Sequence, residues 1–232
     1  MLWKNYLNNH PITLIATGPS LASIPNLFLR KYPTMGVNNC YLRKSIYPWF
    51  YVRNGMNQLN TPKKREASFD VVKNSRASFI GRRYAQHFPF PQVYPLYSDY
   101  DNRVFNLKDW EPKELLFSMV PMEWVGVYAT VTYVALQILL WMNPSEVYIV
   151  GLDHTYQGKD RHFYKDEECP MFIPEDRLGP GGSELAGVTS NGATEAYKLA
   201  REKFEEAGKK IYNLCTTSNT DAFEKREYTE FM

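Results

Sequence analysis

Residue types that could bind a nucleotide gather where short apolar segments of the sequence end. They are Thr17, Gly18, Pro19 and Ser20, then Asn38 and Asn39, then Arg53 and Asn54, and finally Gly151, Asp153 and His154. A glycine lets a phosphate come close, an amide can read a sugar or base, and a carboxylate can hold Mg²⁺. Because ligands bind beyond the carboxyl ends of parallel strands, we expect these groups to converge at one edge of a sheet.

The stretch Thr17-Gly18-Pro19-Ser20 lies between a β-branched run and a predicted helix from Leu21 to about Lys31. Free N–H groups at a helix N-terminus favour anions, so the turn could cradle a phosphate. The stretch matches neither GxGxxG nor a Walker A loop. The alternative is an ordinary turn in which Ser20 is only an N-cap.

The remaining candidates also have two interpretations each. Asn38 and Asn39 could bind a sugar or base edge, or serve only in a turn. Asp153 could hold Mg²⁺ between phosphates and His154 could transfer a proton. Alternatively, Asp153 caps a helix beside a hydrogen-bonded histidine.

A polar loop follows, and it contains a second histidine. His162 in this loop could close over a ligand together with Tyr156, although a loop histidine can also be inert. No zinc-ligand spacing and no GxSxG elbow appears in the sequence.

Strand-like and helix-like segments alternate along the chain, which predicts a parallel, Rossmann-like α/β sheet flanked by helices. The predicted strands are 12–16, 34–37, 49–52, 77–80, 92–96, 146–150 and 210–213, and the later predicted helices are 61–74, 127–142 and 193–207. We expect one domain over 1–232, with an irregular insertion or lid at about 81–121 and a mobile loop at about 157–191.

Composition excludes several functional classes. The 232 residues carry a net charge of +2, so charge gives no case for a nucleic-acid partner. The three cysteines are widely spaced and fit reduced thiols of a cytoplasmic protein. The start of the chain has no signal-peptide pattern. The uncharged stretch Val125–Met142 is interpreted as a buried helix rather than a membrane span, because Tyr, Thr and Gln dilute it.

Several motifs together resemble a known family. TGPSL, VNNCY, ATVTYVALQILLWMNPSEVYIVGLDHTY and AYKLAREKFEEAGKKIYNL look like the 6-hydroxymethylpterin diphosphokinase MptE-like family. The layout is also distantly similar to bacterial sialyltransferases that use a CMP-sugar.

The resemblance implies a nucleotide lying over the Gly18 turn and Asn38. It also implies that Thr130 and Thr132 begin the central helix near the donor, and that Tyr156 lies near the leaving phosphate. Residues 184–191 lack the histidine of the sialyltransferases, and Arg53-Asn54 stands where family members often have an acidic residue.

Three functions follow as hypotheses. The first is a nucleotide-donor transferase, most simply a glycosyltransferase of cell-surface polysaccharide or lipopolysaccharide biosynthesis, with His154, His162 and Tyr156 as catalytic residues. The second is pyrophosphoryl transfer from ATP to a hydroxymethyl pterin. The third is a nucleotide-binding module without catalysis. The expected partners are a nucleotide or nucleotide-sugar donor and a sugar or pterin acceptor, with Mg²⁺ and a homo-oligomer left open.

Overall fold

The computed structural model describes residues 2–43, 46–53, 62–98, 115–128, 130–155, 162–164 and 182–232, without the side chains of 62–64 and 182–191. Eight parallel strands form one sheet in the order β5-β4-β3-β2-β1-β6-β7-β8. They are β1 (Ile12–Ile15), β2 (Thr34–Val37), β3 (Phe50–Arg53), β4 (Ala77–Gly81), β5 (Val93–Leu96), β6 (Glu146–Val150), β7 (Lys210–Asn213) and β8 (Glu224–Lys225). The predicted Rossmann-like fold class is confirmed.

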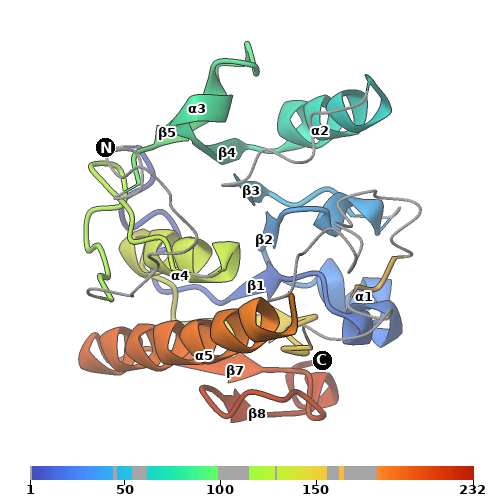
Figure 1. Cartoon of the computed structure of the whole chain (residues 1–232), viewed down its shortest axis with the longest axis vertical. Coiled ribbons are helices and arrows are strands. Elements are labelled where there is room, and N and C mark those ends of the chain that lie inside the picture. The colour runs from blue at the N-terminus through green and yellow to red at the C-terminus, as the bar shows by residue number, and fades with distance from the viewer. Residues whose placement is uncertain are drawn as a thin grey trace.

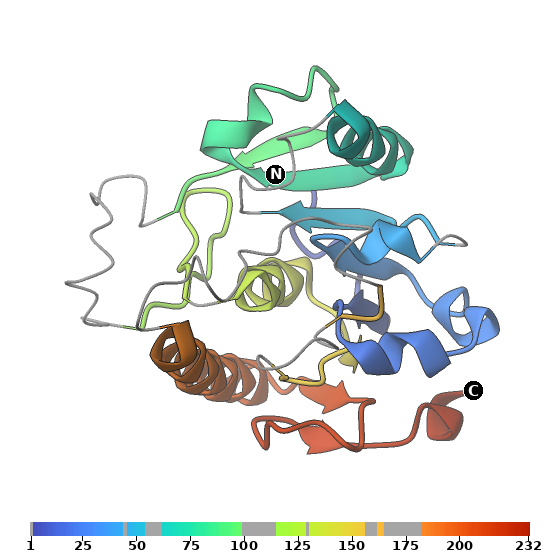
Figure 2. The same cartoon turned by 45° about the vertical axis from the view of Figure 1, so that its right-hand side comes forward.

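Helices cover both faces of this sheet (Figures 1 and 2). They are α1 (Asn26–Leu29), α2 (Pro62–Asn74), α3 (Arg82–Ala85), α4 (Val131–Met142) and α5 (Gly182–Glu206), with 3-10 turns η1 (Pro19–Ser23), η2 (Cys40–Leu42) and η7 (Tyr228–Phe231). One face packs against α4 and α5, and the other against α1, α2 and the C-terminal turn. The strand order reverses between β1 and β6, so a crevice is expected there.

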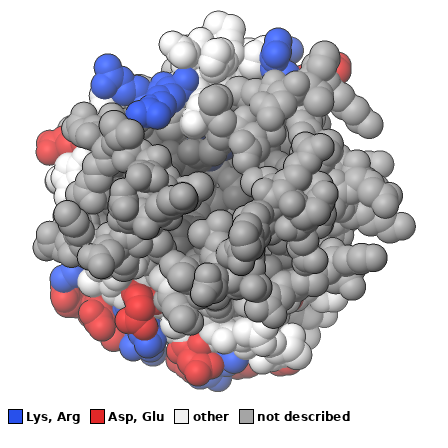
Figure 3. Space-filling model, viewed as in Figure 1, with Lys and Arg blue, Asp and Glu red and all other residues white. Residues whose placement is uncertain are grey.

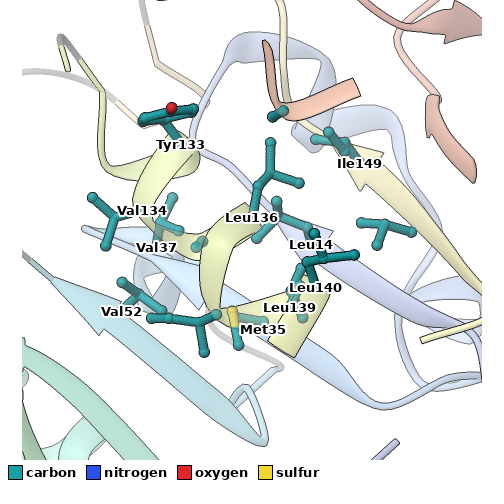
Figure 4. Packing of buried hydrophobic residues seen from close by; sticks show 14 of the residues in the cluster. Leu14, Met35, Val37, Val52, Tyr133, Val134, Leu136, Leu139, Leu140 and Ile149 are labelled. Atoms are coloured by element: carbon teal, nitrogen blue, oxygen red, sulfur yellow. The ribbon is translucent and has the colours of Figure 1, made fainter. Parts of the chain in front are cut away.

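Helix α4 is central to the core, and this explains why it carries no charge. Side chains of α4 such as Val134 and Leu139 belong to one buried cluster with Val37 and Val52 of the sheet (Figure 4). The N-terminal segment covers its end, where the N–H of Leu7 donates to the carbonyl of Met142. Within the described part of the chain, none of the helices has the length and apolar character needed to span a membrane.

Charges of both signs alternate along the outer surface of α5, as Figure 3 shows. Ion pairs join Lys198 to Glu195 and Lys203 to Glu206 over one turn of the helix. These exposed pairs contribute little stability, and they give α5 an ordinary solvated face.

Three sequence predictions about helices need correction. The predicted helix from Leu21 to Lys31 is two short pieces, η1 and α1, because Pro25 precedes α1 with an extended backbone that interrupts the helix. The central helix begins at Val131 rather than near 127. Residues 182–191, expected in a loop, belong to α5. Extending a helix costs less than nucleating one, so weak helix formers can join it.

We expect the protein to lose stability at alkaline pH, because a buried thiol and a buried tyrosine hydroxyl cannot ionise without cost in the folded state. Burial raises the pKa of the Cys40 thiol and of the Tyr51 hydroxyl. In the unfolded chain the thiol ionises near its ordinary pKa of 9.0, whereas the folded state keeps the proton. The free energy of unfolding therefore keeps its full value below this pH, and it falls as the pH rises further. We expect the urea midpoint to fall from about pH 9 to about pH 11. A Cys40→Ala variant should fall less steeply, and an unchanged midpoint would contradict the prediction.

Candidate functional site

A cavity of about 270 Å³ lies at the carboxyl edge of the sheet, where β1 and β6 meet. This volume is close to the lower end of the ~300–1,000 Å³ typical of small-molecule pockets. Its wall comes from residues 16–18 after β1, 37–38 at the end of β2, 130–132 at the start of α4, 151–155 after β6, and the single residues His162 and Tyr197. The candidates after β1, β2 and β6 therefore do converge, as the topology requires. Arg53 at the end of β3 lies outside the described wall, and Asn54 lies outside the described residues.

The backbone N–H groups of the Gly18 turn donate to other atoms of the protein. The N–H of Gly18 donates to the carbonyl of Gly151 at 2.7 Å, and the N–H of Leu21 donates to the carbonyl of Gly18. Ser20 donates to the Asp153 carboxylate through both its N–H (3.0 Å) and its hydroxyl (2.8 Å). Pro19 has no N–H. The expected phosphate cradle is thus already capped by a carboxylate.

Gly18 is needed for close packing and not for an unusual backbone conformation. Its φ is −70°, which any residue can adopt. A Cβ at this position would lie 2.1 Å from Asp153 Oδ2 and 2.7 Å from the carbonyl oxygen of Gly151. Gly151 differs, because its φ of +72° is in the left-handed region that favours glycine. These two glycines bring the loops after β1 and β6 together.

Asp153 links three loops. Besides Ser20, its carboxylate accepts a hydrogen bond from the Cys215 thiol, and its carbonyl accepts one from the N–H of Asn219. Burial raises the pKa of Cys215, which keeps the thiol protonated as a donor. Among the described residues, no three His, Cys, Asp or Glu groups cluster as metal ligands. Asp153 thus caps the Gly18 turn in this structure, and its role as a Mg²⁺ ligand stays a prediction.

Substituting Asp153 separates a capping role from a metal-binding role. We expect Asp153→Asn to keep an oxygen for the N–H of Ser20 and to lose less than about 1 kcal/mol of unfolding free energy. Asp153→Ala leaves that N–H unsatisfied and should cost about 2 kcal/mol. Urea unfolding with and without EDTA measures both effects. A large loss of stability on adding EDTA to the unsubstituted protein would contradict the capping role.

The N-terminus of α4 is the better anion site in this cavity. The Thr130 hydroxyl caps the helix by accepting a hydrogen bond from the N–H of Thr132, and it also accepts one from the Tyr197 hydroxyl. Val131 lies between them in the cavity wall, and the first turn of α4 contains no acidic residue. The positive end of the helix dipole therefore faces the cavity and favours a phosphate there.

Two histidines from different segments line the cavity. His154 has a φ of +57°, its Nε2 is 2.9 Å from the hydroxyl of Thr194 on α5, and its ring meets Tyr197 edge-on. The Nδ1 of His162 is 3.3 Å from the Thr17 hydroxyl. Both side chains are held in place beside the same space, which suits acid–base chemistry.

The paired asparagines have separate roles. Asn38 lines the cavity with a φ of +48°. Asn39 lies outside the cavity wall and is fully buried, and its amide donates to the Tyr164 hydroxyl at 3.0 Å. Since the ring of Tyr164 stacks on His162 at 4.8 Å, Asn39 supports the cavity indirectly. Tyr156 lies outside the described residues.

Sequence reasoning missed three residues that build this site: Thr194, Tyr197 and Cys215. Tyr197 stands beside Ala196 on the buried face of α5, and this spacing was its only signal. The contacts of Thr194 and Cys215 join segments that are far apart in the sequence, so no local sequence pattern predicts them.

Comparison with known proteins finds similarity only at the level of structure. No family model matches the chain, and no curated protein does either. The sialyltransferase CstII from Campylobacter jejuni, solved with cytidine-5'-monophosphate, matches with a TM-score of 0.53 and 15% sequence identity, over 93% of this chain and 84% of that one. The fold is similar to that of a bacterial sialyltransferase.

A second structure of CstII, in complex with a trisaccharide acceptor and CMP, matches with a TM-score of 0.52 and 15% identity, over 93% of this chain and 85% of that one. At this identity the comparison concerns the fold alone. The expected resemblance to the MptE-like family finds no support, because no family model matches.

Proposed function

We propose that this protein is a glycosyltransferase that uses a nucleotide-activated sugar, with a CMP-sugar as the first candidate donor. One observation carries the proposal: the α4 N-terminus and two histidines face one cavity at the β1/β6 switch point. The shared fold supports it, since the similar CstII structures contain CMP, and one contains a trisaccharide acceptor as well.

In this proposal the donor phosphate lies over Thr130, Val131 and Thr132. Negative charge develops on the phosphate as the bond to the sugar breaks, and the fixed dipole at the helix N-terminus stabilises that charge without rearranging. Asn38 contacts the nucleoside. His154 or His162 takes the proton from the acceptor hydroxyl, and Tyr156 adds a hydrogen bond to the leaving phosphate.

The wider assignment is also a proposal. We place the reaction in the cytoplasm, in the assembly of cell-surface polysaccharide such as lipopolysaccharide, with a sugar hydroxyl as acceptor. Pyrophosphoryl transfer from ATP to a pterin has weaker support, because the similar solved structures contain CMP and no family model matches the chain.

Thermal unfolding with CMP, UDP, GDP and ATP, each with Mg²⁺ or with EDTA, tests the proposal. A ligand that binds only the folded state raises the melting temperature, and we expect CMP to do so in EDTA. A shift with ATP alone that requires Mg²⁺ would contradict the proposal and favour the diphosphokinase. Binding of CMP without transfer from any CMP-sugar to any acceptor would favour a non-catalytic module.

A matched pair of variants tests the position of the phosphate. Val131→Glu places a negative charge in the first turn of α4, where it suits the helix dipole but repels a phosphate. Val131→Gln has nearly the same shape without the charge. We expect CMP affinity to fall roughly tenfold or more in the first variant relative to the second. Equal affinities would place the phosphate elsewhere.

A further inference from the structure

A fully buried arginine stands at the carboxyl end of β3 and has no part in the proposed chemistry. Arg53 is 1% exposed, and its guanidinium donates to the hydroxyl of Ser68 on α2 at 2.6 Å. Tyr51 stands two residues earlier on β3, so its side chain lies on the same face of the sheet as Arg53. Burying a charge costs free energy of folding, so we asked which contacts surround this arginine.

The contacts of Tyr51 reach the cavity wall. Tyr51 is fully buried, and its hydroxyl donates to the carbonyl oxygen of Asn38 at 2.7 Å. The N–H of Asn38 donates in turn to the carbonyl of Val52, so both sides of Asn38 are fixed to β3. The hydroxyl of Tyr51 therefore binds the backbone of a residue in the cavity wall.

The backbone of Asn38 is the part that needs such support. Its φ of +48° is in the left-handed region, which is uncommon for non-glycine residues even though asparagine adopts it more readily than most. This conformation sets the direction in which the Asn38 side chain leaves the end of β2. If the carbonyl were released, the residue could return to an extended conformation and the amide would move.

We propose that Tyr51 is a positioning residue that holds Asn38 in its left-handed conformation, and so sets the contact of its amide with the nucleoside of the donor. The proposal rests on the proposed function for the identity of the ligand. The contact that carries it is the hydrogen bond from the Tyr51 hydroxyl to the carbonyl of Asn38. Tyr51 does not belong to the described cavity wall, so it acts through Asn38.

The test removes one oxygen atom with Tyr51→Phe. Tyr148→Phe is the matched control, because that tyrosine is also largely buried and its hydroxyl donates to Glu146, a residue outside the described cavity wall. We expect both variants to lower the melting temperature, but only Tyr51→Phe to weaken CMP binding, by about tenfold. Calorimetric titration of the folded proteins measures this difference. Equal CMP affinities in the two variants would overturn the proposal.

A double-mutant cycle distinguishes positioning from a general loss of structure. Asn38→Gly removes the amide and tolerates a positive φ. If Tyr51 acts through Asn38, adding Tyr51→Phe to Asn38→Gly should change CMP affinity less than twofold, whereas independent effects would multiply. A full tenfold loss in the Asn38→Gly background would refute the relay.

A measurement without ligand keeps the inference separate from the proposed function. The backbone chemical shifts and the HN–Hα coupling of Asn38 report its φ in the free protein. We expect left-handed values in the unsubstituted protein and in Tyr148→Phe, and a change toward extended values in Tyr51→Phe. Left-handed values in Tyr51→Phe would overturn the positioning role. If the unsubstituted protein does not bind CMP, the proposed donor fails while this measurement still decides the role of Tyr51.

Discussion

Replacing Gly18 with alanine is expected to cost about 3 kcal/mol of unfolding free energy and to abolish nucleotide binding. The backbone conformation of Gly18 suits alanine, so the cost is steric. The new Cβ would lie 2.1 Å from Asp153 Oδ2 and 2.7 Å from the backbone oxygen of Gly151. A backbone atom cannot move aside as a flexible side chain can, so the loops after β1 and β6 must separate. Urea unfolding and CMP titration measure the two effects.

Gly208 provides the matched control for this variant. Its φ is +68°, and a Cβ there would meet nothing within 4 Å. Gly208→Ala therefore introduces conformational strain without a clash and should cost about 1 kcal/mol, with CMP affinity unchanged. If the two alanine variants were equally stable, close contact between the loops would not be the reason for Gly18.

Replacing Gln137 with leucine is expected to lower the unfolding free energy by about 4 kcal/mol, because three buried backbone groups would lose their partners. The Oε1 of Gln137 accepts hydrogen bonds from the N–H groups of Ser118 and Gly126, both at 2.9 Å, and its Nε2 donates to the carbonyl of Gly126 at 2.8 Å. This one side chain attaches the segment before α4 to the helix. Thermal and urea unfolding measure the loss, and a cost below about 1 kcal/mol would contradict it.

Gln137→Glu gives this prediction a pH-dependent control. A neutral carboxyl group keeps an O–H that can donate to the carbonyl of Gly126 and an oxygen that can accept, whereas an ionised one cannot donate and is a buried charge. Burial raises the pKa of such a carboxyl in the folded state. The variant should therefore be most stable below about pH 4.3 and lose stability as the pH rises. A stability that rises with pH in this variant would count against the network.

The sequence was sufficient to predict seven of the eight strands, and the reason is local; the two-residue strand β8 (Glu224–Lys225) was not predicted. Runs such as Glu146–Val150 are short, apolar and bounded by turn residues, and this pattern has few other solutions in a parallel sheet. The convergence of Asn38 and His154 also followed, because topology alone brings the ends of parallel strands to one edge, whereas the place of Thr130 was expected only from the family resemblance.

The contacts that each candidate residue makes could not be predicted in the same way. The bond from Ser20 to Asp153 joins residues 133 positions apart, and it turns a supposed phosphate cradle into a capped turn. The contact of Asn39 with Tyr164 likewise spans 125 positions. Only tertiary packing decides whether a polar side chain faces a ligand or another part of the chain. Residue type and spacing do not contain that information.

The left-handed backbone at Asn38 and His154 implies a conflict between stability and ligand recognition. Non-glycine residues with positive φ store about 1 kcal/mol of strain each, and these two lie in the cavity wall. Asn38→Gly would release part of that strain while deleting the amide. A directed-evolution screen for heat resistance alone would therefore enrich variants with a damaged pocket, so selection for stability must include a ligand-binding step.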